Sequence, residues 1–201
     1  MLKLSICVFF LLVFTGCASF HTNTQIPDPA EYSVPGLDVM QPVTIRNGVP
    51  ESGDIMIGRL GIWNIYGDYY KYTESAIGAA TNIFESNHIK VQHGADKVLE
   101  LSVYEAKSRL NEKRTGSGST VIETIALRVR TGDGLTKDYF NSQVHGVVFS
   151  ATRAIERALA QCVVQMLSDK EIISYLEKND EEYYSPQNSF DDGDEYYSPE
   201  E

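Results

Sequence analysis

The chain has 201 residues, of which 42% are hydrophobic, and a formal net charge of −11. Residues 177–201 carry ten acidic residues and one lysine, so a net charge of −9 lies at this end and −2 in all the rest. The remainder is therefore near neutral, which excludes the broad basic surface that nucleic-acid binding needs. The length allows one ordinary domain with extensions at its ends.

The first twenty residues have the organisation of a secretory signal peptide. Lys3 precedes an apolar run of eleven residues from Leu4 to Phe14, which only Ser5 interrupts. A membrane-spanning helix needs about 20 apolar residues, so this run is too short to cross a bilayer. A basic start, a short apolar run and small residues after it are typical of a signal peptide. We therefore expect residues 1–16 to be removed.

The small residues after this run end in a cysteine. Phe14-Thr15-Gly16-Cys17 resembles the lipobox of bacterial lipoproteins, in which lipid is attached to the cysteine and the peptide is cut just before it. The resemblance implies acylation of Cys17. Ala18 replaces the aspartate associated with inner-membrane retention, which implies an anchor in the outer membrane. Several acyl chains, at roughly 0.8 kcal/mol per buried methylene, would hold the protein without spanning the bilayer. The alternative is an ordinary signal peptide with a coincidental cysteine.

The residues after the cleavage site read as a flexible tether. Residues 17–42 combine Asn, Thr and Ser with four prolines, which favour extended backbone with little to bury. These prolines are Pro27, Pro29, Pro35 and Pro42. At about 3.1 Å per residue, such a segment would hold a domain tens of ångströms from the membrane.

Regular structure is expected to begin with two strands, over residues 43–49 and 54–65. Residues 66–72 then read as an aromatic loop with four tyrosines, whose ring faces can stack on sugar rings or on a protein partner. These candidate contact residues are Tyr66, Tyr69, Tyr70 and Tyr72. The alternative is a loop that folds back to cover one end of the core. Thr73 is then the expected N-cap of a short helix, followed by a brief strand over residues 88–92.

The middle of the chain predicts an antiparallel meander of three strands. Leu99, Leu101 and Val103 alternate with polar residues or tyrosine, the period of a half-buried strand. After a glycine-containing hairpin loop over residues 111–119, a second strand over residues 121–130 has an apolar face. A third strand follows another turn. The second strand places Ile125, Leu127 and Val129 on one face, and the third Phe140, Val144 and Val148.

Two helices are expected to follow the meander. Ser150 is the predicted cap of the first helix, whose apolar residues recur at three- and four-residue spacing and include Cys162. Residues 168–171 form a capping box that starts a second, short helix. The order predicts an α+β domain over residues 43–178: an antiparallel sheet of about four to six strands with two or three helices packed on one face. Cys162 is expected to be buried and inert.

The last segment, residues 179–201, is expected to be disordered because it is rich in charge and poor in aliphatic residues. The sequence Glu-Tyr-Tyr-Ser-Pro occurs in it twice. Its tyrosines are Tyr183, Tyr184, Tyr196 and Tyr197. The repeated segments are either docking motifs for a partner or a duplicated, soluble tail without one.

From Tyr72 to Leu176 the chain resembles the YajG-type lipoproteins of the Gram-negative outer membrane. The resemblance lies in Gly94-Ala95-Asp96 before an alternating strand, in Lys137-Asp138-Tyr139, and in Ser168-Asp169-Lys170-Glu171-Ile172 at the close of the last helices. It implies an envelope location and an α+β fold. The family has no established catalytic site, so the resemblance implies no activity.

The sequence offers no constellation typical of catalysis. The four histidines are scattered without metal-ligand spacing, there is no nucleophile elbow, and no cofactor or metal is expected. We therefore expect a non-enzymatic lipoprotein on the periplasmic side of the outer membrane, an interaction or assembly component with an envelope protein partner. The alternative is a ligand-binding lipoprotein that holds a glycan, a peptidoglycan fragment or a lipid through residues 66–72. The sequence leaves the oligomeric state open.

Overall fold

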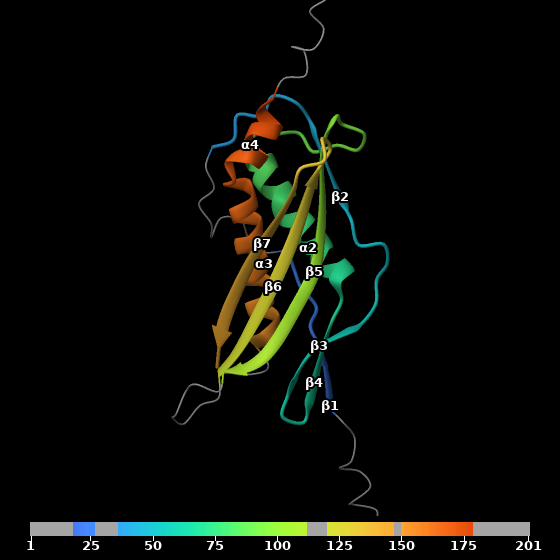
Figure 1. Ribbon diagram of the computed structural model, residues 1–201, viewed down its shortest axis with the longest axis vertical. Coiled ribbons are helices and arrows are strands. Elements are labelled where there is room, and N and C mark those ends of the chain that lie inside the picture. The colour runs from blue at the N-terminus through green and yellow to red at the C-terminus, as the bar shows by residue number, and fades with distance from the viewer. Residues whose placement is uncertain (1–17, 27–35, 112–119, 147–149, 179–201) are drawn as a thin grey trace, which may run out of the picture.

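Seven strands and three helices make up the described part of the chain, which in this computed structural model comprises residues 18–26, 36–111, 120–146 and 150–178 (Figure 1). The predicted α+β class is confirmed. The strands are β1 (Ala18–His21), β2 (Val43–Asn47), β3 (Ile55–Leu60), β4 (Trp63–Gly67), β5 (Lys97–Asn111), β6 (Thr120–Thr131) and β7 (Thr136–His145). The helices are α2 (Tyr69–Ser86), α3 (Ala151–Leu167) and α4 (Lys170–Glu177).

The described strands form one mixed sheet, so the prediction of a purely antiparallel sheet of four to six strands is wrong. The strand order is β1-β4-β3-β5-β6-β7, and β2 also pairs with β5. β5, β6 and β7 form the predicted antiparallel meander, but β1 pairs with β4, and β2 with β5, in parallel. A parallel pair needs a long crossover connection. The connection from β2 to β5 contains β3, β4 and α2. The residue pattern within either strand does not reveal that β2 and β5 are neighbours in the sheet.

The helices cover one face of β5, β6 and β7, and the other face carries no described helix (Figure 1). Ile125, Leu127 and Val129 lie on the helix side and are fully buried, as their alternation predicts. Phe140 and Val144 also share a face, but it is the uncovered one, where they are 55% and 60% exposed. We call this surface of the three strands the open face.

Helix α3 supplies much of the core on the covered face. Its apolar stripe is buried, and Cys162 is fully buried as predicted. Burial raises the pKa of the Cys162 thiol to about 12, which keeps it protonated and unreactive at neutral pH. The predicted caps differ in detail. Ser150 makes no capping bond to α3, and Asp169, rather than Ser168, caps α4 by accepting from the Glu171 N–H at 2.9 Å.

Residues 54–72 differ from their predicted strand and loop. Gly61, with φ of 63°, allows a tight turn that divides the predicted strand into β3 and β4. The predicted loop is the end of β4 and the first turn of α2. Asp68 caps this helix by accepting from the backbone N–H groups of Tyr70 and Lys71 at 3.0 and 3.3 Å, so Thr73 lies inside α2. Residues 88–92 contain only an isolated bridge, between Val91 and Val43.

Two side chains of α2 accept backbone hydrogen bonds along one edge of β5, where no described strand is paired with it. β2 pairs with β5 only from Lys97 to Leu101, and β3 pairs with it at Ser108. Between these positions the Val103 N–H donates to Thr73 Oγ1 at 2.8 Å, and the Ala106 N–H donates to the Tyr69 hydroxyl at 3.2 Å. The helix thus replaces missing strand partners with hydroxyl groups.

Thr73→Val is expected to destabilise the fold by about 1–3 kcal/mol, because it leaves the buried Val103 N–H without an acceptor. Thr73→Ser keeps the hydroxyl and serves as the matched control. Urea denaturation of residues 17–201 carrying Cys17→Ser measures the difference. Equal unfolding free energies for the two variants would show that this bond contributes nothing.

Two described parts of residues 17–42 are docked on the domain, so the prediction of a flexible tether fails for them. Residues 18–21 form β1, and Thr22 is buried, with its backbone N–H donating to the Tyr66 carbonyl at 3.0 Å. Leu37 and Val39 are buried in the core. The described residues do not include 27–35, 112–119 or 147–149. The predicted position of Val148 on the face of Phe140 and Val144 therefore lies outside them. Among the described helices, none has the length and apolar character needed to cross a bilayer.

Candidate functional site

A cluster of four side chains at the centre of the open face is the candidate site. Tyr104 comes from β5, Arg128 from β6, and Asp138 and Phe140 from β7. Strand register sets Arg128 directly opposite Asp138, and Phe140 opposite Ala126. Tyr104 is the extra residue at a β-bulge, where pairing shifts between Val103 and Glu105. We call Tyr104, Arg128, Asp138 and Phe140 the open-face cluster.

The cluster is held by charged hydrogen bonds. Arg128 Nε and Nη2 donate to the two oxygens of Asp138, each at 2.8 Å, in a bidentate pair. The Tyr104 hydroxyl donates to Asp138 Oδ2 at 3.3 Å. Hydrogen bonding from Arg128 lowers the pKa of the Asp138 carboxyl, so the aspartate stays ionised at neutral pH. Partial burial, followed by the nearby Asp138 charge, raises the pKa of Tyr104.

Ring contacts complete the cluster. The Arg128 guanidinium lies 4.6 Å from the centre of the Tyr104 ring, and the Tyr104 and Phe140 rings meet edge to face at 6.2 Å. Ala126, between them on β6, is fully buried although it lies on the open face. Arg128 remains 48% exposed and Phe140 55% exposed. The cluster is therefore fixed in position and still available to a partner.

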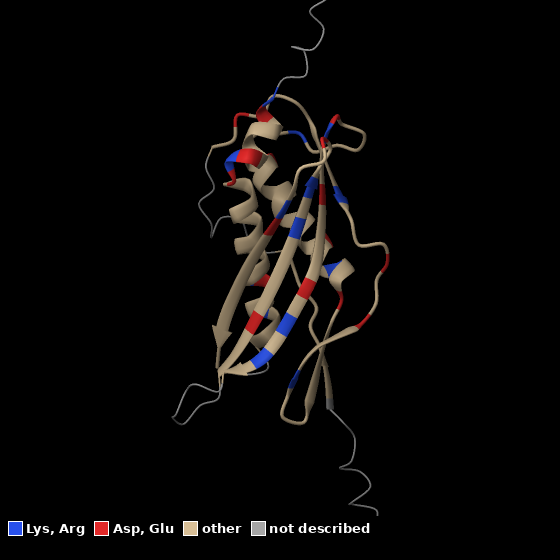
Figure 2. Cartoon of the chain, viewed as in Figure 1, with Lys and Arg blue, Asp and Glu red and all other residues tan. Residues whose placement is uncertain are grey.

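A depression of about 340 Å³ adjoins the cluster toward the turn between β6 and β7. Its lining is polar. The residues are Glu100, Ser102, Arg128, Arg130, Gly134 and Thr136. Both acidic and basic residues occur along these strands (Figure 2), and the cluster and depression combine Glu100 and Asp138 with Arg128 and Arg130, so this part of the open face has no strong charge of one sign. The site combines exposed aromatic rings, arginines and a shallow hollow, which suits recognition of a surface better than chemistry on a small molecule.

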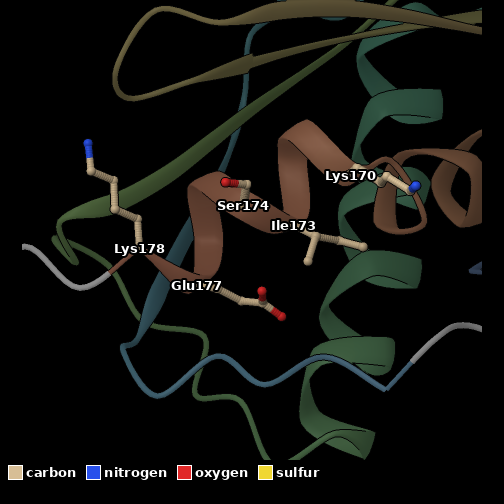
Figure 3. A pocket seen from close by; sticks show the side chains of 5 residues that line it. All are labelled: Lys170, Ile173, Ser174, Glu177 and Lys178. Carbon is tan, nitrogen blue, oxygen red and sulfur yellow. The ribbon is translucent and has the colours of Figure 1, made fainter.

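A second depression, of about 450 Å³, lies at α4. Its lining residues are Lys170, Ile173, Ser174, Glu177 and Lys178. All come from one helix and the residue after it, and their side chains point in different directions (Figure 3). This surface therefore gathers no convergent set of groups.

The four tyrosines predicted to line a loop do not form one site. Tyr72 is fully buried, and its hydroxyl bonds to Thr22, so Tyr72 cannot contact a ligand. Tyr69 supports β5, and the Tyr66 ring stacks on His21 with centroids 5.3 Å apart. Tyr70 is half-buried. The structure thus corrects the loop prediction and puts Tyr69 and Tyr72 in supporting roles. The predicted sites Cys17, Tyr183, Tyr184, Tyr196 and Tyr197 lie outside the described residues.

A buried polar cluster between β5, β6, β7 and the start of α3 escaped prediction. Glu123 is fully buried and accepts from Ser108 Oγ at 2.8 Å and from His145 Nε2 at 3.2 Å. His145 Nδ1 lies 2.7 Å from Ser150 Oγ. Glu123 lies two residues before Ile125 in a strand whose side chains alternate between the two faces, so it shares the buried face with Ile125. This spacing could have predicted its burial.

The buried cluster contains the groups of a serine–histidine–acid relay, but these groups are shielded from solvent. The His145 side chain is 10% exposed and Glu123 is not exposed at all. Desolvation raises the pKa of the Glu123 carboxyl, against the effect of its bonds from Ser108 and His145. We therefore assign these groups to holding β5, β6, β7 and the start of α3 together.

Comparison with known proteins gives no match to any family model and no match among curated proteins. Several solved structures are similar in part, among them these three. A DUF330 protein from Xanthomonas campestris is 13% identical, with a TM-score of 0.44 over 75% of this chain and 93% of that one. A minor lipoprotein from Acinetobacter baumannii is 11% identical, with a TM-score of 0.37 over 65% and 92%. The PelC dodecamer from Paraburkholderia phytofirmans is 15% identical, with a TM-score of 0.37 over 69% and 96%.

Proposed function

We propose that this chain is a lipid-anchored lipoprotein of the bacterial envelope that acts without catalysis, as an interaction component of an envelope complex, and that the open-face cluster docks its partner protein. The signal peptide and Cys17 support the anchor. The docking role rests on one observation: a pre-positioned set of Tyr, Arg and Phe side chains on a sheet face that no described helix covers.

Such side chains suit protein recognition for a physical reason. Tyr and Arg are enriched among the residues that contribute most to protein–protein affinity. The bidentate bond to Asp138 fixes Arg128 before binding, so docking loses less side-chain entropy than it would with a free arginine. Phe140 and Val144 are both more than half exposed. The partner packs a small apolar surface on them.

The charge beside the cluster defines the rest of the partner surface. Arg130 lines the adjoining depression and is exposed, and Glu100, which lies opposite it, is engaged by Arg46 at 2.7 Å. A carboxylate of the partner next to its apolar patch would therefore meet Arg130 while the apolar patch covers Phe140. The outer membrane, its periplasmic face and membership of the YajG-type family complete the proposal, and they rest on the sequence patterns alone.

A photo-crosslinking amino acid at position 140 tests the docking surface in living cells. We expect it to capture one envelope protein reproducibly, because Phe140 lies at the centre of the proposed interface. The matched position is Arg153, which is exposed on α3 at the helix side of the sheet. Capture that is equal at both positions, or absent from position 140, would contradict the proposal.

A double substitution gives the energetic counterpart. Tyr104→Ala with Phe140→Ala removes the two rings, and truncation of such anchors costs at least about 2 kcal/mol of binding free energy, or roughly thirtyfold in affinity. Binding of the captured partner to the purified protein measures this loss. Arg153→Ala is the control, and a double variant that binds like this control would place the interface elsewhere.

A further inference from the structure

The end of the molecule that carries β1 presents an exposed turn beside the start of the mature chain. β1 and the turn between β3 and β4 lie side by side at one end of the long axis, and α4 lies at the other end (Figure 1). The Ile62 side chain in this turn is 71% exposed, and Trp63 is half-exposed. Arg59, just before the turn, is also exposed.

Strand register sets the distance between this turn and the lipid anchor. β1 and β4 are parallel, and Ala18 is paired with Trp63. Neighbouring strands lie about 4.8 Å apart, and consecutive Cα atoms about 3.8 Å. Cys17 precedes Ala18, so its backbone is bonded to the strand end that lies beside Trp63, and Ile62 precedes Trp63 in the same direction. Because β1 belongs to the sheet, no spacer separates an acylated Cys17 from the domain.

We infer that the turn formed by Gly61, Ile62 and Trp63 enters the interface of the phospholipid monolayer that holds the Cys17 lipid. The inference rests on the proposed acylation of Cys17. Ile62 is apolar and enters the acyl boundary, while the Trp63 indole has an apolar body and a polar N–H, which suits the headgroup level. Arg59 is paired with Asn64, further from the tip of the turn, where its guanidinium can meet lipid phosphates.

The inserted turn fixes the orientation of the domain. The protein stands with β1 and the β3–β4 turn at the membrane and with α4 and Lys178 at the distal end. Lys178, after which residues 179–201 follow in the sequence, is therefore far from the lipid. The open face runs along the length between the two ends and faces sideways, where an envelope partner can reach it.

Trp63 makes the inference directly measurable, because it is the one tryptophan in the chain. The acylated protein is purified from membranes and reconstituted into phosphatidylethanolamine–phosphatidylglycerol vesicles. We expect Trp63 fluorescence to shift to shorter wavelength relative to the soluble mature protein with Cys17→Ser, and to be quenched when dibrominated phospholipid is included. A variant with Trp63→Phe and Thr136→Trp moves the reporter to the exposed start of β7, near the distal end, where we expect neither effect.

Each other outcome overturns the inference in a distinguishable way. Mass spectrometry reports acylation of Cys17 separately from the fluorescence. An acylated protein whose Trp63 is not quenched overturns insertion of the turn and leaves the anchor intact. Equal quenching of both reporters overturns the upright orientation, because the protein then lies flat. An unmodified Cys17 overturns the proposed anchor together with this inference. Ile62→Asp in the acylated protein is expected to abolish the quenching, and quenching that persists would exclude a role for Ile62.

Discussion

Cys17→Ser is expected to move the whole protein from the membrane fraction to the soluble periplasm. A serine hydroxyl cannot form the thioether that carries the lipid, and the acyl chains supply the membrane affinity at roughly 0.8 kcal/mol for each buried methylene. The Ile62–Trp63 turn is too small to hold the protein alone, since stable anchoring takes more than one weak signal. Fractionation and mass spectrometry of the mature N-terminus measure the effect.

An uncleaved signal peptide would imitate an anchor, so the comparison needs a matched leader. In the Cys17→Ser protein, residues 1–16 are replaced by the signal peptide of a secreted protein, which is cut without lipidation. The variant Ala18→Asp, made with the native leader, is expected to shift the acylated protein to the inner membrane. A Cys17→Ser protein that is processed and still membrane-bound would contradict the anchor and favour the coincidental cysteine.

His145→Phe is expected to destabilise the domain by about 1–3 kcal/mol at pH 7, the cost of taking one hydrogen-bond donor away from a buried carboxylate. Glu123 is fully buried, and its Oε2 has no hydrogen-bond partner among the described residues. Both of its donors, Ser108 and His145, reach Oε1. The substitution therefore leaves a buried carboxylate with a single donor, and it also removes the ring that meets Ser150.

The pH dependence of this variant follows from the direction of the Glu123 shift. Desolvation raises the pKa of Glu123 in the folded protein above its unfolded value, so the folded state holds this proton more tightly. The contribution of Glu123 is therefore most favourable below the unfolded pKa and is lost as pH rises through the folded pKa. The stability deficit of His145→Phe is expected to be small in acid and to grow toward neutral pH.

A rescue experiment separates the buried charge from simple loss of packing. Adding Glu123→Gln to His145→Phe removes the charge and keeps an oxygen that accepts from Ser108, so most of the lost stability should return at pH 7. Urea denaturation at several pH values measures all three proteins. A deficit that is independent of pH and that Glu123→Gln does not restore would assign the effect to packing.

Local patterns were enough for the elements that alternate strongly. The period of two in β6 located its buried face, and the apolar stripe of α3 predicted the burial of Cys162. The same alternation, extended by two residues, places Glu123 inward. The pattern in β7 correctly placed Phe140 and Val144 on the same face of the strand. It did not show which face the helices cover, because an exposed apolar face and a buried one have the same period.

The sequence by itself determined the α+β class and the central meander, and it alone carries the predictions of a signal peptide and of a lipid site at Cys17, because each depends on residues close together in the chain. Only the tertiary structure decided the rest. Register across β6 and β7 brings Arg128 to Asp138 and Glu123 close to His145, and parallel pairing of β1 with β4 brings Ala18 to Trp63. These contacts join distant segments through the sheet, and their positions follow from how strands align rather than from any local pattern.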